Sequence, residues 1–117
     1  MRRIYCASPF SASTAQLVEA NIDHAVTTGI KVREMGAIPV VPHISVPPFL
    51  GMDVVACWEP AMRECRSHLK SCEALLLTGD WRASRGCQLE RLVAYEEKIP
   101  TFESVEDLAA WLKEVAA

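Results

Sequence analysis

The chain alternates short apolar runs with longer amphipathic segments. The apolar runs have the length and the bounding residues of strands, and they cover residues 3–7, 37–41, 74–77 and 98–102. The amphipathic segments have apolar residues at helical spacing, and they cover residues 13–35, 58–70, 84–95 and the stretch after residue 103. Strands that alternate with helices favour a parallel sheet with right-handed crossovers. The pattern therefore predicts one α/β domain over residues 1–117.

Two of the expected strands can be placed in the sheet from their composition. The run Ala74–Leu77 is apolar throughout, which is typical of a parallel strand covered on both faces. The second strand contains Pro39, which cannot donate a hydrogen bond to a neighbouring strand, so we expect it at an edge. The long segment 44–57 contains two adjacent prolines and a glycine, and we expect a binding loop or a lid there.

Polar residues before the amphipathic segments mark where helices begin. Ser13 and Ser104 each have a capping-box partner three residues later, and Ser84 is expected to cap the helix that follows it. Gly36 is expected to end the first helix. The predicted inner faces are Leu17, Ile22, Ala25, Val26, Gly29 and Val32 on the first helix, Met62, Cys65 and Leu69 on the second, and Leu89, Leu92, Val93 and Tyr95 on the third.

The loops expected at one edge of the sheet carry the candidate chemistry. Ligands of parallel α/β sheets bind beyond the carboxyl ends of the strands, where the strand order reverses. The loop after the first strand, His43 and residues 80–90 should meet there. A helix that begins at Ser84 presents unpaired N–H groups to an anion, and Gly86 allows close approach to the backbone. Glu90 either complements the dipole of this helix and faces solvent, or acts as a nucleophile or general base. The convergence of the loops favours the second interpretation.

Other polar residues of these loops also have two interpretations. Ser8 and Ser11 either turn and cap the chain or hydrogen-bond phosphate or sugar oxygens. His43 is either structural or a ligand contact. Asp80 and Trp81 belong to the polar loop that follows the central strand.

Composition and charge narrow the range of functions. A net charge of -3 without a basic run argues against binding of a nucleic-acid polymer. No apolar run approaches the roughly 20 residues of a membrane span, and the first residues resemble a strand rather than a signal peptide. The chain has five cysteines and no C-x-x-C pair, which argues against a zinc site or a disulfide framework and favours the cytoplasm. No metal or cofactor is expected, since neither ligand spacing nor a dinucleotide fingerprint is present.

The motifs resemble the nucleoside 2-deoxyribosyltransferase-like superfamily. The likeness is to its small bacterial and phage members, which are related to 2′-deoxynucleoside 5′-phosphate N-hydrolases. It rests on YCASPF at residues 5–10, PH at 42–43, GDWRASRG at 79–86 and Glu90, and it spans essentially the whole chain. The resemblance implies a flavodoxin-like or Rossmann-like three-layer sandwich with a four- to five-stranded parallel sheet. It also implies a homo-oligomer that cleaves or transfers the N-glycosidic bond of a nucleoside or nucleoside 5′-monophosphate.

Carried onto this chain, the resemblance assigns the nucleophile to Glu90 and its orienting hydrogen bond to Tyr5. The implied substrate contacts are Ser8, Pro9, Phe10, Ser11, His43, Asp80, Trp81, Ser84 and Gly86. Ser84 stands six residues before Glu90, where monophosphate hydrolases place a serine for the 5′-phosphate. With Ser8, Ser11 and Arg85 nearby, this favours a phosphorylated substrate, or a substrate that is none of those the transferases use.

One position departs from the pattern of the superfamily. Cys65 stands where relatives commonly have an aspartate near the sugar and base, so protonation of the base would need another donor, such as Asp80 or His43. Two other functions are therefore open: a nucleotide-binding or sensing module without chemistry, and an interaction subunit that uses the apolar middle segment, with Phe49, Leu50, Met52 and Trp58. The base, the sugar and the choice between hydrolysis and transfer are also open.

Overall fold

The sheet has four parallel strands in the order β2-β1-β3-β4 in the computed structural model, which describes residues 1–45 and 54–116. The strands are β1 (Arg3–Ala7), β2 (Ile38–Val40), β3 (Ala74–Leu77) and β4 (Thr101–Phe102). The parallel α/β sandwich is confirmed, and β2, with Pro39, lies at an edge as predicted. The strand order reverses between β1 and β3, because β2 is added on one side of β1 and β3 on the other. The expected ligand position is therefore beyond the carboxyl ends of β1 and β3.

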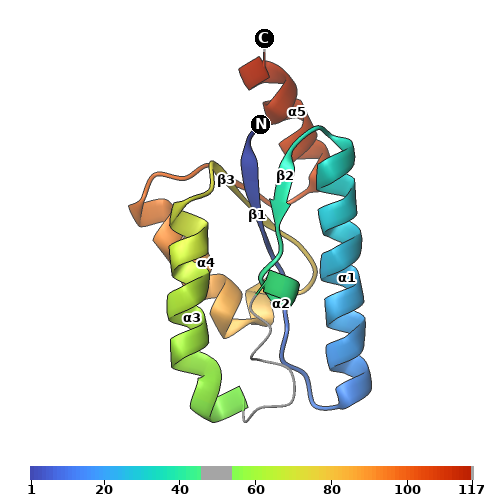
Figure 1. The fold of residues 1–117 in the computed structure, drawn as a ribbon, viewed down its shortest axis with the longest axis vertical. Helices are drawn as coiled ribbons and strands as arrows, with labels where there is room; N and C mark the ends of the chain where they lie inside the picture. Colours follow the sequence, from blue (N-terminus) through green and yellow to red (C-terminus); the bar gives the residue numbers. More distant parts are fainter. Residues whose placement is uncertain (46–53, 117) are drawn as a thin grey trace.

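Helices cover both faces of the sheet (Figure 1). They are α1 (Ala15–Glu34), α2 (Pro42–Ser45), α3 (Val54–Lys70), the 3-10 turn η2 (Trp81–Ala83), α4 (Arg85–Glu96) and α5 (Val105–Ala116). Helices α1 and α5 pack on one face, and α3 and α4 pack on the other. None of the helices in the described part of the chain combines the length and apolarity that a membrane crossing requires.

Alternation along β1 and β3 divides the core into two layers. Tyr5 and Leu75 are paired in register and point toward α3 and α4, while Ile4 and Leu76 point toward α1 and α5. All four side chains are fully buried. The alternation matters for the site because it places the Tyr5 hydroxyl on the α4 side of the sheet.

The structure corrects the start of α1. Thr14, not Ser13, is the N-cap, and its side-chain oxygen accepts from the Leu17 N–H at 3.1 Å. Gly36 follows the last turn with a φ of 84°, as predicted for a terminating glycine. Leu17 was expected in the core but is 51% exposed, because the first turn of α1 extends past the sheet to the rim of the cavity described below.

The structure also corrects the inner face of α4. Leu92 and Tyr95 were expected inside but are 52% and 82% exposed. The buried residues are instead Cys87, Glu90 and Ala94. Cys87 and Ala94 are small, so the helix lies close against the sheet, and this rotation turns the carboxyl group of Glu90 inward.

Candidate functional site

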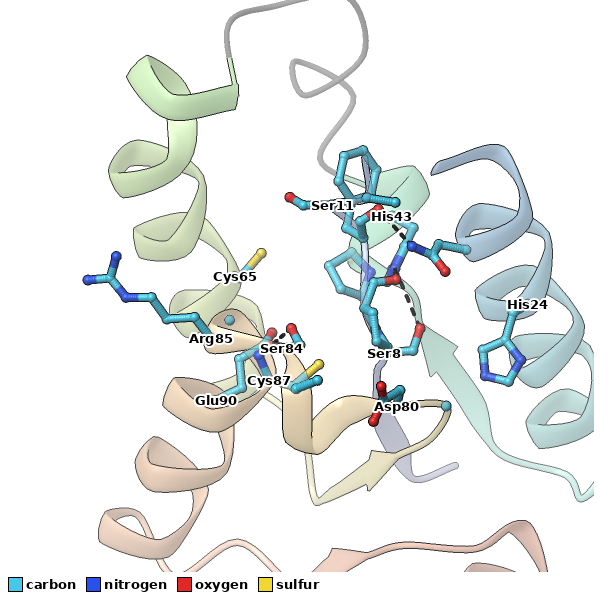
Figure 2. Close-up of a pocket in the computed structure, with 18 of the residues that line it drawn as sticks. Ser8, Ser11, His24, His43, Cys65, Asp80, Ser84, Arg85, Cys87 and Glu90 are labelled. Carbon is cyan, nitrogen blue, oxygen red and sulfur yellow. Dashed lines mark hydrogen bonds between the residues drawn. The ribbon is translucent and has the colours of Figure 1, made fainter. Parts of the chain in front are cut away.

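A cavity of about 550 Å³ lies at the carboxyl ends of β1 and β3, at the predicted ligand position. Its walls come from the loop after β1, from α2 after β2, and from the η2–α4 segment after β3, with α1 and α3 closing the sides. The polar residues of its lining are Ser8, Ser11, Asn21, His24, His43, Asp80, Ser84, Arg85 and Glu90. In Figure 2, Ser84, Cys87 and Glu90 lie on the α4 side, and Ser8, His43 and His24 lie on the opposite side.

The start of α4 is fixed by the predicted cap. The Ser84 side-chain oxygen accepts from the Cys87 N–H at 3.3 Å, and the Ser84 carbonyl accepts from the Gln88 N–H at 3.0 Å. Gly86 is packed beneath α3, where an added Cβ would lie 3.5 Å from the Met62 sulfur. The first turn of α4 therefore faces the cavity with its backbone close to the lining.

Glu90 is the buried acid of the cavity. Its side chain is only 5% exposed, and its Oε2 accepts a hydrogen bond from the Tyr5 hydroxyl, which comes from β1 beneath the cavity. Burial raises the pKa of the Glu90 carboxyl to about 7, although the Tyr5 hydrogen bond acts in the opposite direction. Burial, together with the neighbouring Glu90, raises the pKa of Tyr5 well above 10, so Tyr5 remains the donor. A carboxyl group that titrates near neutral pH inside a cavity is typical of catalytic sites.

Two thiols flank this carboxyl group. Cys65 on α3 and Cys87 on α4 are both buried and both line the cavity. Burial raises the pKa of the Cys65 thiol to about 11 and that of the Cys87 thiol to about 12, so both are neutral near pH 7. Each thiol is therefore an uncharged, weak hydrogen-bond donor at the edge of the cavity.

His43 holds the loop after β1. Its Nε2 lies 3.0 Å from the Pro9 carbonyl oxygen and 3.5 Å from the Ser8 Oγ. A carbonyl can only accept, so Nε2 carries the proton and donates it to Pro9. Burial lowers the pKa of His43, which keeps the ring neutral. The Phe10 ring lies against His43, with 5.5 Å between the ring centroids. His43 thus shapes the cavity wall and has no free N–H for a leaving group.

Most of the residues predicted for the site come together in the structure. Those in the lining are Ser8, Pro9, Phe10, Ser11, His43, Asp80, Ser84, Gly86 and Glu90. Tyr5 lies under the lining and reaches it through Glu90. Trp81 does not line the cavity: it is 6% exposed in the α3–α4 core, with the Arg82 guanidinium 4.4 Å from its ring centroid. Its position in η2 turns the ring toward the sheet.

The sequence analysis named Arg85 and Trp58 without predicting their contact, and it missed Asn21 and His24 as lining residues. The Arg85 guanidinium stacks on Trp58, 4.3 Å from the ring centroid, and both side chains line the cavity. Asn21 donates to the Phe10 carbonyl at 3.0 Å, and His24 contacts the Thr78 hydroxyl at 3.0 Å. Asn21 and His24 interrupt the apolar face of α1 near its start, and that interruption was the available signal.

The described residues contain no group of three or more His, Cys, Asp or Glu side chains arranged to hold a metal ion.

Comparisons with known proteins support this description of the fold. A family model described as a domain of unknown function, DUF7768, matches residues 2–103. The chain belongs to this family. The matched region includes every element that lines the cavity. No curated protein matches the sequence.

A solved structure also matches this member of the DUF7768 family. It comes from a study of a 2-deoxyribosyltransferase from the psychrotolerant bacterium Bacillus psychrosaccharolyticus, and it superposes with a TM-score of 0.67. The match covers 92% of this chain and 90% of the other, with 17% sequence identity. At that identity, the likeness establishes a shared fold.

Proposed function

We propose that this protein cleaves or transfers the N-glycosidic bond of a nucleoside or nucleoside 5′-monophosphate, with Glu90 as the nucleophile. The observation that carries the proposal is the buried Glu90 carboxyl, held by the Tyr5 hydroxyl at the β1–β3 cavity. The fold shared with a 2-deoxyribosyltransferase supports this choice of chemistry. A soluble, cytoplasmic homo-oligomer, expected from composition and resemblance, is part of the same proposal.

The reaction follows from what a buried carboxylate can do. The ionised Glu90 attacks the anomeric carbon while the bond to the base nitrogen breaks, and the base leaves with the electron pair. Water or a second base then displaces Glu90 from the sugar. The sugar carries positive charge in the transition state. The carboxylate therefore stabilises the transition state more strongly than it stabilises the neutral substrate. Tyr5 keeps one carboxylate oxygen fixed, which leaves the other for the sugar.

The lining supports a nucleoside-sized substrate. Cavities for small molecules commonly have volumes of about 300–1,000 Å³, and this one is within that range. Ser84, Arg85 and the first turn of α4 provide hydroxyl, guanidinium and N–H donors at one end, which suits a 5′-phosphate. Asp80 is the second carboxyl of the lining, and it is the candidate donor to the leaving base because the N–H of His43 is already bonded to Pro9.

The test is release of free base from a panel of deoxyribonucleosides, ribonucleosides and their 5′-monophosphates, with and without an acceptor base. Glu90→Gln should lower the rate at least about a thousandfold, because the amide cannot form the covalent intermediate. Glu96→Gln is the matched control, since Glu96 is exposed on the same helix. Acceptor dependence would separate a transferase from a hydrolase. Full activity in Glu90→Gln would refute the proposed nucleophile.

A second candidate function is a nucleotide-binding or sensing module without chemistry. The neutral Cys65 thiol in the lining favours it, since relatives commonly have a carboxyl group there. This function predicts that bound nucleotide is recovered intact after hours. Cys65→Asp separates the two functions: base release that appears only in this variant would identify a binding module that lacks the acid. Release by the wild-type protein would rule the module out.

The interaction-subunit hypothesis remains a prediction. Phe49, Leu50 and Met52 lie outside the described residues, and Trp58 is half-buried and stacked on Arg85.

A further inference from the structure

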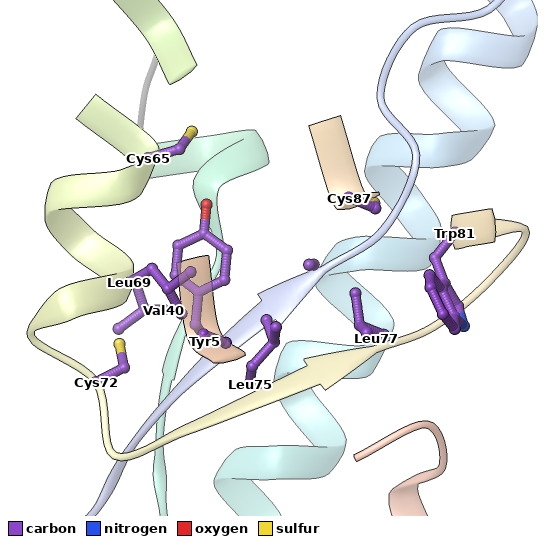
Figure 3. Packing of buried hydrophobic residues seen from close by; sticks show 11 residues of the cluster. Tyr5, Val40, Cys65, Leu69, Cys72, Leu75, Leu77, Trp81 and Cys87 are labelled. Atoms are coloured by element: carbon purple, nitrogen blue, oxygen red, sulfur yellow. The ribbon is translucent and has the colours of Figure 1, made fainter. Parts of the chain in front are cut away.

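One wall of the cavity is held by the core, and the opposite wall is not. On the Glu90 side, α3 and α4 pack on the sheet through one buried cluster that includes Tyr5, Leu69 and Leu75 (Figure 3). The opposite wall is the loop of residues 8–12, which leads from β1 toward α1 and lines the cavity along its whole length. In the part of the chain that the structure describes, none of the backbone–backbone hydrogen bonds outside helices and strands involves this loop. The loop therefore depends on side chains to hold its backbone in place.

Two side chains bind consecutive carbonyl groups of this loop. The Asn21 side-chain amide, on α1, donates to the Phe10 carbonyl oxygen at 3.0 Å. The His43 Nε2, on α2, donates to the Pro9 carbonyl oxygen at 3.0 Å, and the His43 ring packs against the Phe10 ring. These two hydrogen bonds, the loop anchor, fasten the middle of the loop to two different helices.

Packing alone would not select either of the two donors. His43 is 4% exposed, and its Nδ1 is buried without a hydrogen-bond partner among the described residues. A buried acceptor without a partner destabilises the fold, and an apolar side chain at this position would avoid that loss. Asn21 lies within α1, where asparagine is a poorer helix former than alanine. What an apolar residue or an alanine would lack at both positions is the N–H donor that reaches the loop.

We propose that Asn21 and His43 are positioning residues that together hold the loop of residues 8–12 at a fixed distance from Glu90. This inference rests on the proposed function, and it names the residues that set the width of the cavity. Glu90 and its partner Tyr5 are held on the other side, in contact with the α3–α4 core. Loss of the loop anchor should therefore weaken the binding of substrate and of transition state alike. Uniform weakening of this kind raises KM and leaves kcat in place.

The direct test measures the order of the loop in the free protein by NMR relaxation of the backbone amides of residues 10–12. In the wild type, the order parameters should be close to about 0.85, the value of rigid backbone. Asn21→Asp keeps the shape of the side chain but replaces the N–H donor with a carboxylate oxygen, which repels the Phe10 carbonyl. The order parameters of the loop should then fall below about 0.6.

His43 and a matched control complete the test. His43→Met removes the donor and should loosen the loop as Asn21→Asp does, whereas His43→Gln keeps an N–H donor and should retain the order. If His43→Met does not fold, Asn21→Asp decides alone, since Asn21 is only partly buried. The control is Gln88→Glu, because the Gln88 amide donates in the same way to the Arg82 carbonyl at 2.9 Å, outside the cavity lining. It should leave the order of residues 10–12 unchanged.

Unchanged order in Asn21→Asp, or an equal loss of order in Gln88→Glu, would overturn the inference. The relaxation measurement needs no substrate, so its outcome is independent of base release. A loop that loosens as expected, without base release by the wild type, would keep the loop anchor and count against the proposed function. Base release with unchanged loop order in Asn21→Asp would remove the loop anchor and leave the proposed function standing.

Where base release is found, the kinetics separate positioning from a general loss of structure. In Asn21→Asp, KM should rise about tenfold while kcat stays within about twofold of the wild-type value, and His43→Gln should keep the wild-type KM. A fall in kcat at unchanged KM would contradict the inference, because the change would then reach Glu90.

Discussion

The protonation of Glu90 links the chemistry of the site to the stability of the fold. The pKa of its carboxyl is raised by burial from 4.5 to about 7, so the folded protein keeps a proton that the unfolded chain has lost between these pH values. The stability that this group contributes is present in full below pH 4.5 and is lost as the pH rises through 7. From the difference between these two pKa values, ionisation of Glu90 lowers the free energy of unfolding by roughly 3 kcal/mol. Natural proteins retain such a cost mainly at functional sites.

The first prediction concerns Glu90→Gln. A neutral amide does not ionise, so the variant should gain stability relative to wild type as the pH rises from 5 to 8. The gain should approach roughly 3 kcal/mol, and the measurement is urea unfolding at both pH values. Glu96→Gln, on the exposed side of α4, should show little of this change. A constant difference between Glu90→Gln and wild type at pH 5 and pH 8 would show that the carboxyl is not buried as described.

At the scale of single elements, the sequence predicted where strands and helices lie, but it did not predict which face a helix turns toward the core. The apolar run Ala74–Leu77 and the Ser84 cap were predicted correctly because each depends on neighbouring residues alone. The face that α4 buries depends on tertiary packing. Hydrophobicity favoured Leu92 and Tyr95, whereas the structure buries Glu90, and no spacing rule favours a buried carboxylate. The disagreement between pattern and structure falls on the candidate site itself.

Residues of the site could be grouped from sequence, but their contacts could not. The parallel topology predicted that the loops after β1, β2 and β3 would meet, and they do. It could not show that Trp81 turns into the core or that Trp58 stacks on Arg85, since both depend on side-chain directions set by packing. The cap of α1 was missed by one residue because Ser13 and Thr14 are both suitable by type, and residue type alone favours the serine.

Close packing of α1 on β2 gives a prediction at the element scale. Gly29 is buried in α1, and a Cβ there would lie 2.8 Å from the Val41 Cγ2 and 3.6 Å from the Pro39 Cβ. Gly29→Ala should therefore destabilise the protein by about 1–3 kcal/mol, although alanine favours helix formation by about 1 kcal/mol. The measurement is the free energy of unfolding in urea.

The control for this prediction is the double variant Gly29→Ala, Val41→Ala. It removes the methyl group that would clash, so it should be more stable than the sum of the two single changes indicates. If the changes in the free energy of unfolding are strictly additive, α1 shifts as a unit to accept the alanine. The Val41 side chain is then not what disfavours a Cβ at position 29.

For the whole molecule, the decisive question is whether the cavity binds a cationic ligand more tightly than a neutral one. The switch point between β1 and β3 brings loops from three strands around one carboxyl that titrates near pH 7. In the proposed reaction the sugar becomes cationic, so it should bind more strongly to the ionised carboxyl, whereas a neutral nucleoside gains little from the charge. A cationic ligand therefore reports on the transition state, and the pH at which it binds reports on Glu90.

The last prediction uses a pyrrolidine analogue of the sugar, whose amine stays protonated from pH 6 to pH 8. With a Glu90 pKa of about 7, the ionised fraction rises about tenfold over this range, so the affinity should rise by about the same factor. Calorimetric titration at both pH values measures it, and the shift in Tm at saturating ligand should be larger at pH 8. Glu90→Gln should remove the pH dependence, because the amide has no ionised form. Equal affinities at pH 6 and pH 8 in the wild-type protein would mean that the cation does not contact Glu90. That result would contradict the proposed position of the carboxyl beside the anomeric carbon.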